Sequence, residues 1–294
     1  MNNIFNNLIN DEYDTNTNKY SFDKLNEEII SDNDNESDKK YMEPTILQSI
    51  NLDKYFSKDD IEFSTKNNKL LKITDKGLYS ISKHYDAEWI TKNIVSFLKS
   101  KDIIPSKTNI IDGTAGIGGN TINFAKYFAK VYSIEINKTH YEVLKNNVDA
   151  LSIFNVDVYL DNFLNIINDN QANQANQANQ SNQSNQTNQT NQTNQTNQTN
   201  QTNQTSLKKF KSNIFFFDPP WGGKSYKNYK YFNLKIGKLP IYTIINNLFD
   251  KNFKYVILKA PYNLNLSPIF SSIKYENMNI NSNFKKNMII VIFY

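Results

Sequence analysis

Short apolar runs of strand length alternate with segments of helical period along most of the chain. The predicted strands are 109–111, 131–134, 156–160, 213–217 and 255–258, with helical patterns at 121–129, 141–151 and 241–249. The chain closes with a predicted antiparallel pair near 274–280 and 288–293. This order predicts a doubly wound α/β fold, in which a mostly parallel sheet carries an antiparallel last strand. In such sheets ligands bind beyond the carboxyl ends of the strands.

Two polar segments interrupt this pattern. Residues 170–205 are Asn-Gln-Ala, Asn-Gln-Ser and Asn-Gln-Thr triplets, which cannot bury enough apolar surface to fold, so we expect a disordered insertion. Residues 1–44 are rich in Asn and hold 11 acidic residues against 4 lysines, which predicts a disordered acidic head. We therefore expect this head, a small helical addition or lid at 45–100, and an α/β domain at 101–294 that the insertion interrupts.

The composition of the chain argues against disulfide-rich, metal-binding and membrane-spanning classes of protein. Cysteine is absent and only 2 histidines occur, so we expect neither disulfides nor a metal site. No apolar run approaches the roughly 18 residues of a membrane span, and the N-terminus lacks the order of a signal peptide, so we expect a soluble intracellular protein. Of the total charge of +4, the head contributes −7 and the remaining chain +11. A basic domain favours an anionic partner such as nucleic acid.

A glycine cluster follows the first predicted strand and opens a helix, in the run Asp112-Gly113-Thr114-Ala115-Gly116-Ile117-Gly118-Gly119. Glycines let the backbone turn sharply and approach a ligand closely. Glu135 ends the second strand, where a carboxylate accepts both hydroxyls of a ribose. Dinucleotide and S-adenosylmethionine sites share this arrangement, and Asp112, which suits a cationic amino group, favours S-adenosylmethionine. Either Asp161 or Asn162, after the third strand, is expected to accept the adenine amine of that cofactor.

A second cluster follows the fourth predicted strand, in the run Asp218-Pro219-Pro220-Trp221-Gly222-Gly223. The two prolines lack amide hydrogens, stiffen the turn and direct the Pro219 carbonyl outward. An exocyclic amine on a planar base can donate to this carbonyl and to Asp218, which turns its nitrogen lone pair toward a methyl donor. Trp221 offers a stacking face, because the two glycines that follow have no side chains to cover it. We therefore interpret Asp218 and Pro219 as the catalytic turn.

The motifs resemble known methyltransferases. Asp-Pro-Pro-Trp alone is similar to the amino-methyltransferases, including adenine-N6 enzymes. Pro219 to Gly223 followed by Tyr226 resembles specifically the trimethylguanosine synthase family, the RNA cap guanine-N2 methyltransferases. The glycine loop from Asp112 to Thr121 and the upstream segment 75–82 are also similar to this family. The resemblance implies a class I S-adenosylmethionine-dependent methyltransferase with a seven-stranded, Rossmann-like sheet.

The family resemblance also implies roles for single residues. Glu135 holds the cofactor ribose, Trp221 stacks on the 7-methylguanine of the cap, and position 218 lies beside the attacking amine. The further residues expected at the cofactor are Ser82, Asp112, Gly113, Thr114 and Gly116, and those expected at the cap are Gly222 and Tyr226. The implied reaction is methyl transfer to the N2 amine of a 7-methylguanosine cap, which gives di- or trimethylguanosine. The implied partner is capped small nuclear or nucleolar RNA. The resemblance implies the nucleus as the compartment, with the cytoplasm left open, and we expect a monomer.

The chain departs from the family pattern at positions 218 and 162 and in the upstream segment, where Leu78 replaces the family's Trp and Lys83 its Pro. Position 218 is usually Ser in the family and is Asp here, as in adenine-N6 enzymes. Asn162 stands where the family has Asp before Phe. Two alternatives therefore stay open: an adenine-N6 or other amino-methyltransferase acting on nucleic acid, and a non-catalytic cap-binding protein that kept the fold.

Overall fold

The computed structural model of the protein describes residues 43–47, 50–167, 210–223 and 225–294. The predicted insertion at 170–205, and the predicted head up to residue 42, lie outside the described residues. Among the described residues, no helix has the length and apolar character needed to cross a membrane.

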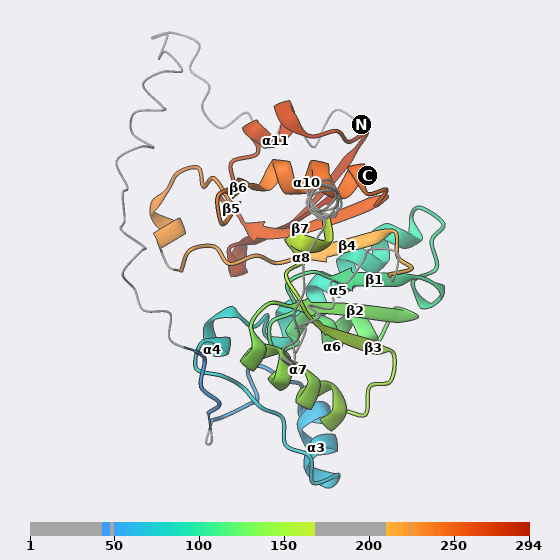
Figure 1. Cartoon of the computed structure of the whole chain (residues 1–294), viewed down its shortest axis with the longest axis vertical. Coiled ribbons are helices and arrows are strands. Elements are labelled where there is room, and N and C mark those ends of the chain that lie inside the picture. The colour runs from blue at the N-terminus through green and yellow to red at the C-terminus, as the bar shows by residue number, and fades with distance from the viewer. Residues whose placement is uncertain (1–42, 48–49, 168–209, 224) are drawn as a thin grey trace, which may run out of the picture. The chain divides into compact units, whose positions relative to one another are not determined.

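A seven-stranded sheet in the order β3-β2-β1-β4-β7-β9-β8 forms the centre of the fold (Figure 1). Its strands are β1 (Asn109–Asp112), β2 (Lys130–Glu135), β3 (Val156–Leu160), β4 (Ile214–Phe217), β7 (Tyr255–Pro261), β8 (Met278–Asn283) and β9 (Met288–Phe293). The strands from β3 to β7 are parallel to their neighbours, whereas β9 is antiparallel to both β7 and β8. The predicted doubly wound sheet with an antiparallel last strand is therefore confirmed.

Alternate side chains of the central strands pack into two apolar layers, one on each face of the sheet. Ile111, Phe215 and Phe217 pack with α8, α10 and α11, whereas Ile110 and Phe216 pack with α5, α6 and α7. The helices of the two layers are α5 (His84–Lys99), α6 (Gly119–Ala125), α7 (Lys138–Ala150), α8 (Phe163–Ile167), α10 (Ile241–Asp250) and α11 (Ser267–Ser272). Burial on both faces explains why the central strands are continuous apolar runs without alternation.

The residues before the sheet pack directly on the glycine loop. They include α3 (Lys58–Lys66) and α4 (Gly77–Ser80), and the chain then passes through Ser82 into α5. A Cβ placed on Gly119 would collide with the backbone carbonyl of Ser82. The absence of a side chain at Gly119 is therefore what allows the N-terminal segment to lie against the loop after β1.

The smaller elements complete the fold. Short 3-10 helices occur at η2 (Pro105–Lys107), η4 (Ser225–Asn228) and η5 (Phe284–Lys286), and a two-stranded hairpin is formed by β5 (Lys235–Ile236) and β6 (Leu239–Pro240).

Two predicted elements have different limits in the structure. Helix α6 ends at Ala125 instead of residue 129, because the amides of Tyr127 and Phe128 both donate to the Phe124 carbonyl and turn the chain toward β2. The penultimate strand lies at 278–283 instead of 274–280, where its register with β9 is fixed by hydrogen bonding.

Candidate active site

The predicted site residues lie at the carboxyl ends of neighbouring parallel strands. Asp112 ends β1, Glu135 ends β2, and Asp218 follows β4 directly. The chain fills the sheet outward from β1 in one direction and from β4 in the other, so the strand order reverses between these two strands. This is the crevice in which ligands of doubly wound sheets bind.

Asp112 is completely buried beneath the glycine loop. Its Oδ2 accepts a hydrogen bond from the Thr121 hydroxyl at 2.7 Å, and that hydroxyl also lies 2.9 Å from the Ser133 Oγ. The other carboxylate oxygen, Oδ1, is a buried polar atom without a hydrogen-bond partner among the described residues. Burial raises the pKa of Asp112 from 3.8 to about 7, against the opposing effect of the Thr121 hydrogen bond.

The raised pKa of Asp112 predicts a pH-dependent stability. Between pH 4 and 7 the unfolded chain ionises at this position while the folded chain keeps the proton, so the free energy of unfolding falls as pH rises. A shift of this size corresponds to on the order of 4 kcal/mol. In Asp112→Asn, which cannot ionise, we expect a flatter dependence of the unfolding free energy on pH, measured by urea denaturation without cofactor. Equal slopes for the variant and the parent would contradict this assignment.

Glu135 lies beside the glycine loop and is 7% exposed. Its Oε2 accepts the Gly116 amide at 2.8 Å, and its Oε1 accepts the Asn137 amide at 2.8 Å. Burial raises the pKa of Glu135, and the backbone amides that donate to it oppose the rise. Gly116 has φ +56°, and a Cβ there would meet nothing within 4 Å, so the loop borders open space at this point. One carboxylate thus fixes the loop conformation next to that space.

Asp161 and Asn162 form the turn between β3 and α8. The Asp161 amide donates to the Glu135 carbonyl at 3.0 Å, which joins this turn to the end of β2. Asp161 Oδ1 accepts the Asn162 amide at 2.7 Å, and Asn162 Oδ1 accepts the Leu164 amide at 3.0 Å. Both side chains are half-buried. One side-chain oxygen of each residue therefore already accepts a backbone amide, and the choice between the two residues as adenine acceptor stays a prediction.

Asp218 is held by three different parts of the chain. Its Oδ2 accepts from Lys259 Nζ at 2.6 Å, from Ser82 Oγ at 3.2 Å and, more distantly, from Asn120 Nδ2 at 3.5 Å. Its backbone amide donates to Thr114 Oγ1 at 2.7 Å. The predicted cofactor residues Ser82 and Thr114 are thus brought to the turn that carries Asp218.

Lys259, on β7, is the site residue that the sequence analysis missed. Its side chain and that of Asp218 are each 10% exposed, and its Nζ also donates to Ser82 Oγ at 2.9 Å. It is the one charged residue in the apolar run Tyr255-Val256-Ile257-Leu258-Lys259-Ala260-Pro261. A lysine in the middle of a strand buried on both faces requires a partner. The sequence therefore indicates that Lys259 has a partner, but it does not identify Asp218 as that partner.

The Pro-Pro-Trp-Gly-Gly turn begins with the buried Pro219 and continues to Trp221, which is half-buried. Tyr226 meets Trp221 edge to face, with ring centroids 5.3 Å apart, and Lys259 Nζ lies 5.3 Å from the Trp221 ring centroid. Gly222 and Gly223 have φ +74° and +77°, which L side chains rarely adopt, and a Cβ on Gly223 would meet nothing within 4 Å. The turn therefore needs glycine at both positions.

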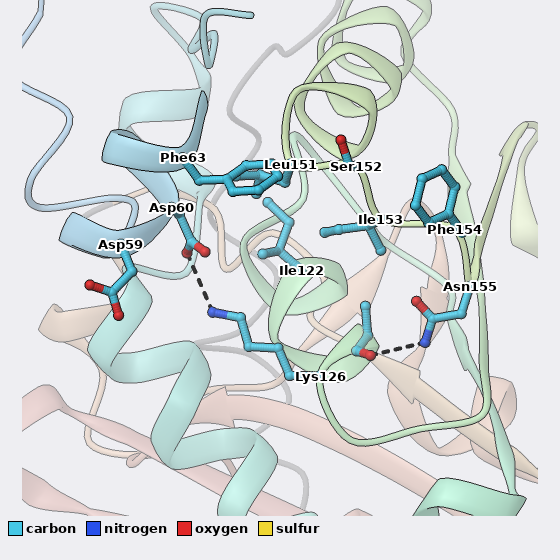
Figure 2. A pocket seen from close by; sticks show the side chains of 11 residues that line it. Asp59, Asp60, Phe63, Ile122, Lys126, Leu151, Ser152, Ile153, Phe154 and Asn155 are labelled. Atoms are coloured by element: carbon cyan, nitrogen blue, oxygen red, sulfur yellow. Dashed lines mark hydrogen bonds and ion pairs between the residues drawn. The ribbon is translucent and has the colours of Figure 1, made fainter. Parts of the chain in front are cut away.

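A pocket of about 580 Å³ lies elsewhere, between α3, α6 and the loop after α7 (Figure 2). Asp60 on α3 pairs with Lys126 at 3.4 Å across it, and Phe63, Ile122 and Phe154 form part of its wall. None of the predicted site residues lines this pocket.

The sequence of this chain is similar to those of a known protein family. The sequence model of the RNA cap guanine-N2 methyltransferase family matches residues 107–292. An uncharacterized protein of Acanthamoeba polyphaga mimivirus is 31% identical over 196 residues, which are 66% of this chain. This chain covers 62% of the length of that relative.

Solved methyltransferase structures show more distant similarity. A putative methyltransferase of Porphyromonas gingivalis has a TM-score of 0.46 at 12% identity, over 79% of this chain and 48% of the other. A 16S rRNA N2 methyltransferase of T. thermophilus, in complex with AdoMet and guanosine, has a TM-score of 0.40 at 12% identity, over 70% and 42%. The family match spans the glycine loop, Glu135 and the Asp-Pro-Pro-Trp turn. The chain therefore belongs to the RNA cap guanine-N2 methyltransferase family, whose cofactor is S-adenosylmethionine, as the sequence predicted.

Proposed function

We propose that the protein transfers a methyl group from S-adenosylmethionine to the exocyclic N2 amine of a 7-methylguanosine RNA cap. The observation that carries this proposal is the position of the Asp218–Trp221 turn. The Thr114 hydroxyl joins this turn to the glycine loop, and Ser82 joins it to the N-terminal segment that packs on that loop. The turn that we propose to bind the amine therefore lies next to the glycine loop that we propose to bind the cofactor. The family match supports guanine N2 as the acceptor.

The residues of the crevice fit S-adenosylmethionine. Glu135 oxygens accept one backbone amide each and retain lone pairs for the ribose hydroxyls. Asp112 Oδ1 is a buried acceptor without a partner among the described residues, which suits the cationic methionine end. Open space beside Gly116 lets the cofactor approach the loop backbone. When bound, the cofactor supplies an electrophilic methyl group on a positively charged sulfur.

In the proposed reaction the residues of this chain orient the amine and receive its proton. The three hydrogen bonds to the Asp218 side chain all go to Oδ2, so we assign the amine to Oδ1 and to the Pro219 carbonyl. The N2 lone pair forms the new C–N bond while the C–S bond breaks, and the nitrogen then loses a proton to Asp218 or to water. The positive charge of 7-methylguanine already acidifies N2, so we expect orientation to supply most of the rate enhancement.

Asp218 also favours a second candidate, transfer to the N6 amine of adenine, because an Asp begins the same turn in adenine-N6 enzymes. The structure supplies a physical reason why Asp can stand where the cap enzymes usually have Ser. The ammonium of Lys259 neutralises the carboxylate, so the turn has no net charge from this pair.

The test is mass analysis of products after incubation with S-adenosylmethionine and 7-methyl-GDP, capped RNA, uncapped RNA or adenine-containing DNA. We expect one or two added methyl groups on the first two substrates only. Trp221→Ala should lower kcat/KM for 7-methyl-GDP by about 10- to 100-fold, because stacking on a base is worth about 1–3 kcal/mol. Trp221→Phe should retain most of the activity, and cofactor affinity should be equal in all three proteins. Methylation of adenine, or full activity of Trp221→Ala, would overturn the assignment.

A further inference from the structure

The stretch that follows the Pro-Pro-Trp turn is strongly basic. Between Asp218 and Asp250 the sequence has no acidic residue and 5 lysines, at positions 224, 227, 230, 235 and 238. Of these, Lys224 lies outside the described residues, and the other four are exposed. Lys227, Tyr229, Lys230 and Tyr231 form a surface that we call the Tyr-Lys segment. It starts six residues after Trp221.

Two tyrosines of this segment have exposed rings. Tyr229 is 46% exposed and Tyr231 is 61% exposed, and the Lys230 ammonium lies 5.6 Å from the Tyr231 ring centroid. Lys227 lies in the same way 5.9 Å from the Tyr226 ring. Aromatic rings interleaved with cations are what proteins present to single-stranded nucleic acid, where rings stack on bases and lysines contact phosphates.

The segment is held in a fixed shape beside the site. Asn263, which is 7% exposed, donates from Nδ2 to the Tyr226 carbonyl at 2.9 Å and to the Tyr229 carbonyl at 2.7 Å. The Phe232 amide donates to the Asn263 carbonyl at 2.7 Å, which anchors the other end of the segment just beyond β7. Figure 1 shows this stretch leaving the end of β4 and passing toward the β5–β6 hairpin. A surface that is already ordered loses less entropy when a ligand binds.

The segment is also joined to the base-binding turn. Tyr226 is 8% exposed and packs its ring against Trp221, so the buried side of the segment supports the tryptophan while the tyrosines at 229 and 231 remain at the surface. We propose that the Tyr-Lys segment binds the single-stranded RNA that follows the cap, with Tyr231 and Tyr229 against bases and Lys227 and Lys230 at phosphates. This inference rests on the proposed function, since it takes Trp221 as the place of the cap base.

The inference predicts that loss of the lysines affects long substrates and spares short ones. In Lys227→Ala/Lys230→Ala we expect kcat/KM for a capped 10-nucleotide RNA to fall about tenfold at low salt, and kcat/KM for 7-methyl-GDP to stay unchanged. Each phosphate contact on a single strand contributes about −0.7 to the slope of log affinity against log salt, so the slope should flatten by about 1.4. Tyr231→Ala should weaken RNA binding without changing that slope. As a control, Lys58→Ala/Lys66→Ala removes two exposed lysines of α3. This variant should leave kcat/KM unchanged for both the capped RNA and 7-methyl-GDP.

Binding is measured in parallel by fluorescence anisotropy with a labelled single-stranded RNA, which requires no turnover. The parent protein could methylate neither substrate while the double variant still binds RNA more weakly. That result would support RNA binding by the Tyr-Lys segment and overturn the proposed function. Equal RNA binding by the parent and the double variant overturns the inference. An equal loss of kcat/KM on RNA and on 7-methyl-GDP also overturns it, because the lysines would then act on the reaction centre.

Discussion

Lys259→Met is expected to lower the free energy of unfolding by about 3–5 kcal/mol, because it leaves the Asp218 carboxylate without its partner. Both side chains of this ion pair are 10% exposed, and the N–O distance is 2.6 Å. Breaking a largely buried pair by removing one member leaves the other charge poorly solvated and without a partner. Methionine fills a similar volume, so the lost charge and not a cavity accounts for the effect. Urea denaturation at neutral pH measures the change.

A double variant separates the charge effect from a packing effect. In Asp218→Ser/Lys259→Met no buried charge of the pair remains, so most of the lost stability should return. The exposed pair of Lys274 and Asp250 gives a matched control, since its side chains are 70% and 56% exposed. Lys274→Met should change the unfolding free energy by less than about 1 kcal/mol. If the double variant were no more stable than Lys259→Met, the charge of Asp218 would not be the cause.

The sequence predicted that three candidate site residues lie at the carboxyl ends of strands, and the structure has them there. Asp112, Glu135 and Asp218 each follow an apolar run, and parallel strands bring their carboxyl ends to one edge of the sheet. The contact between Asp218 and Lys259 joins residues 41 positions apart, one directly after β4 and the other on the neighbouring strand β7. Pattern along the chain shows that Lys259 needs a partner, but the side-chain geometry that selects Asp218 and Ser82 exists only in the folded protein.

The same distinction applies to the limits of elements. The apolar residues Tyr127 and Phe128 continue the helical period past Ala125, yet Phe128 is buried from a turn and not from the helix. The edge strand β8 has alternating Asn residues and half-buried positions, so its own pattern is weak. Its place at 278–283 is set by hydrogen bonding to the fully buried β9.

Glu135→Ala is expected to weaken S-adenosylmethionine binding by about 100- to 10,000-fold. Two hydrogen bonds from ribose hydroxyls to a carboxylate are worth about 1.5–3 kcal/mol each, and tenfold in affinity corresponds to about 1.4 kcal/mol. The alanine variant also removes the acceptor of the Gly116 amide at 2.8 Å, so the loop loses the contact that fixes its shape. Isothermal titration calorimetry with the cofactor measures the change.

Two further variants show whether the charge or the mere presence of a side chain at position 135 matters. Glu135→Gln keeps an acceptor for one amide but turns an NH2 group toward the second, so its cofactor affinity should lie between those of the parent and the alanine variant. Asp157→Ala removes a carboxylate of the neighbouring strand β3, which is 43% exposed and pairs with Lys130, and should leave the affinity unchanged. Affinity of Glu135→Ala within threefold of the parent would show that the ribose binds elsewhere. Because Glu135 also accepts the Gly116 amide, the alanine variant should lose more affinity than Glu135→Gln, which keeps an acceptor for that amide.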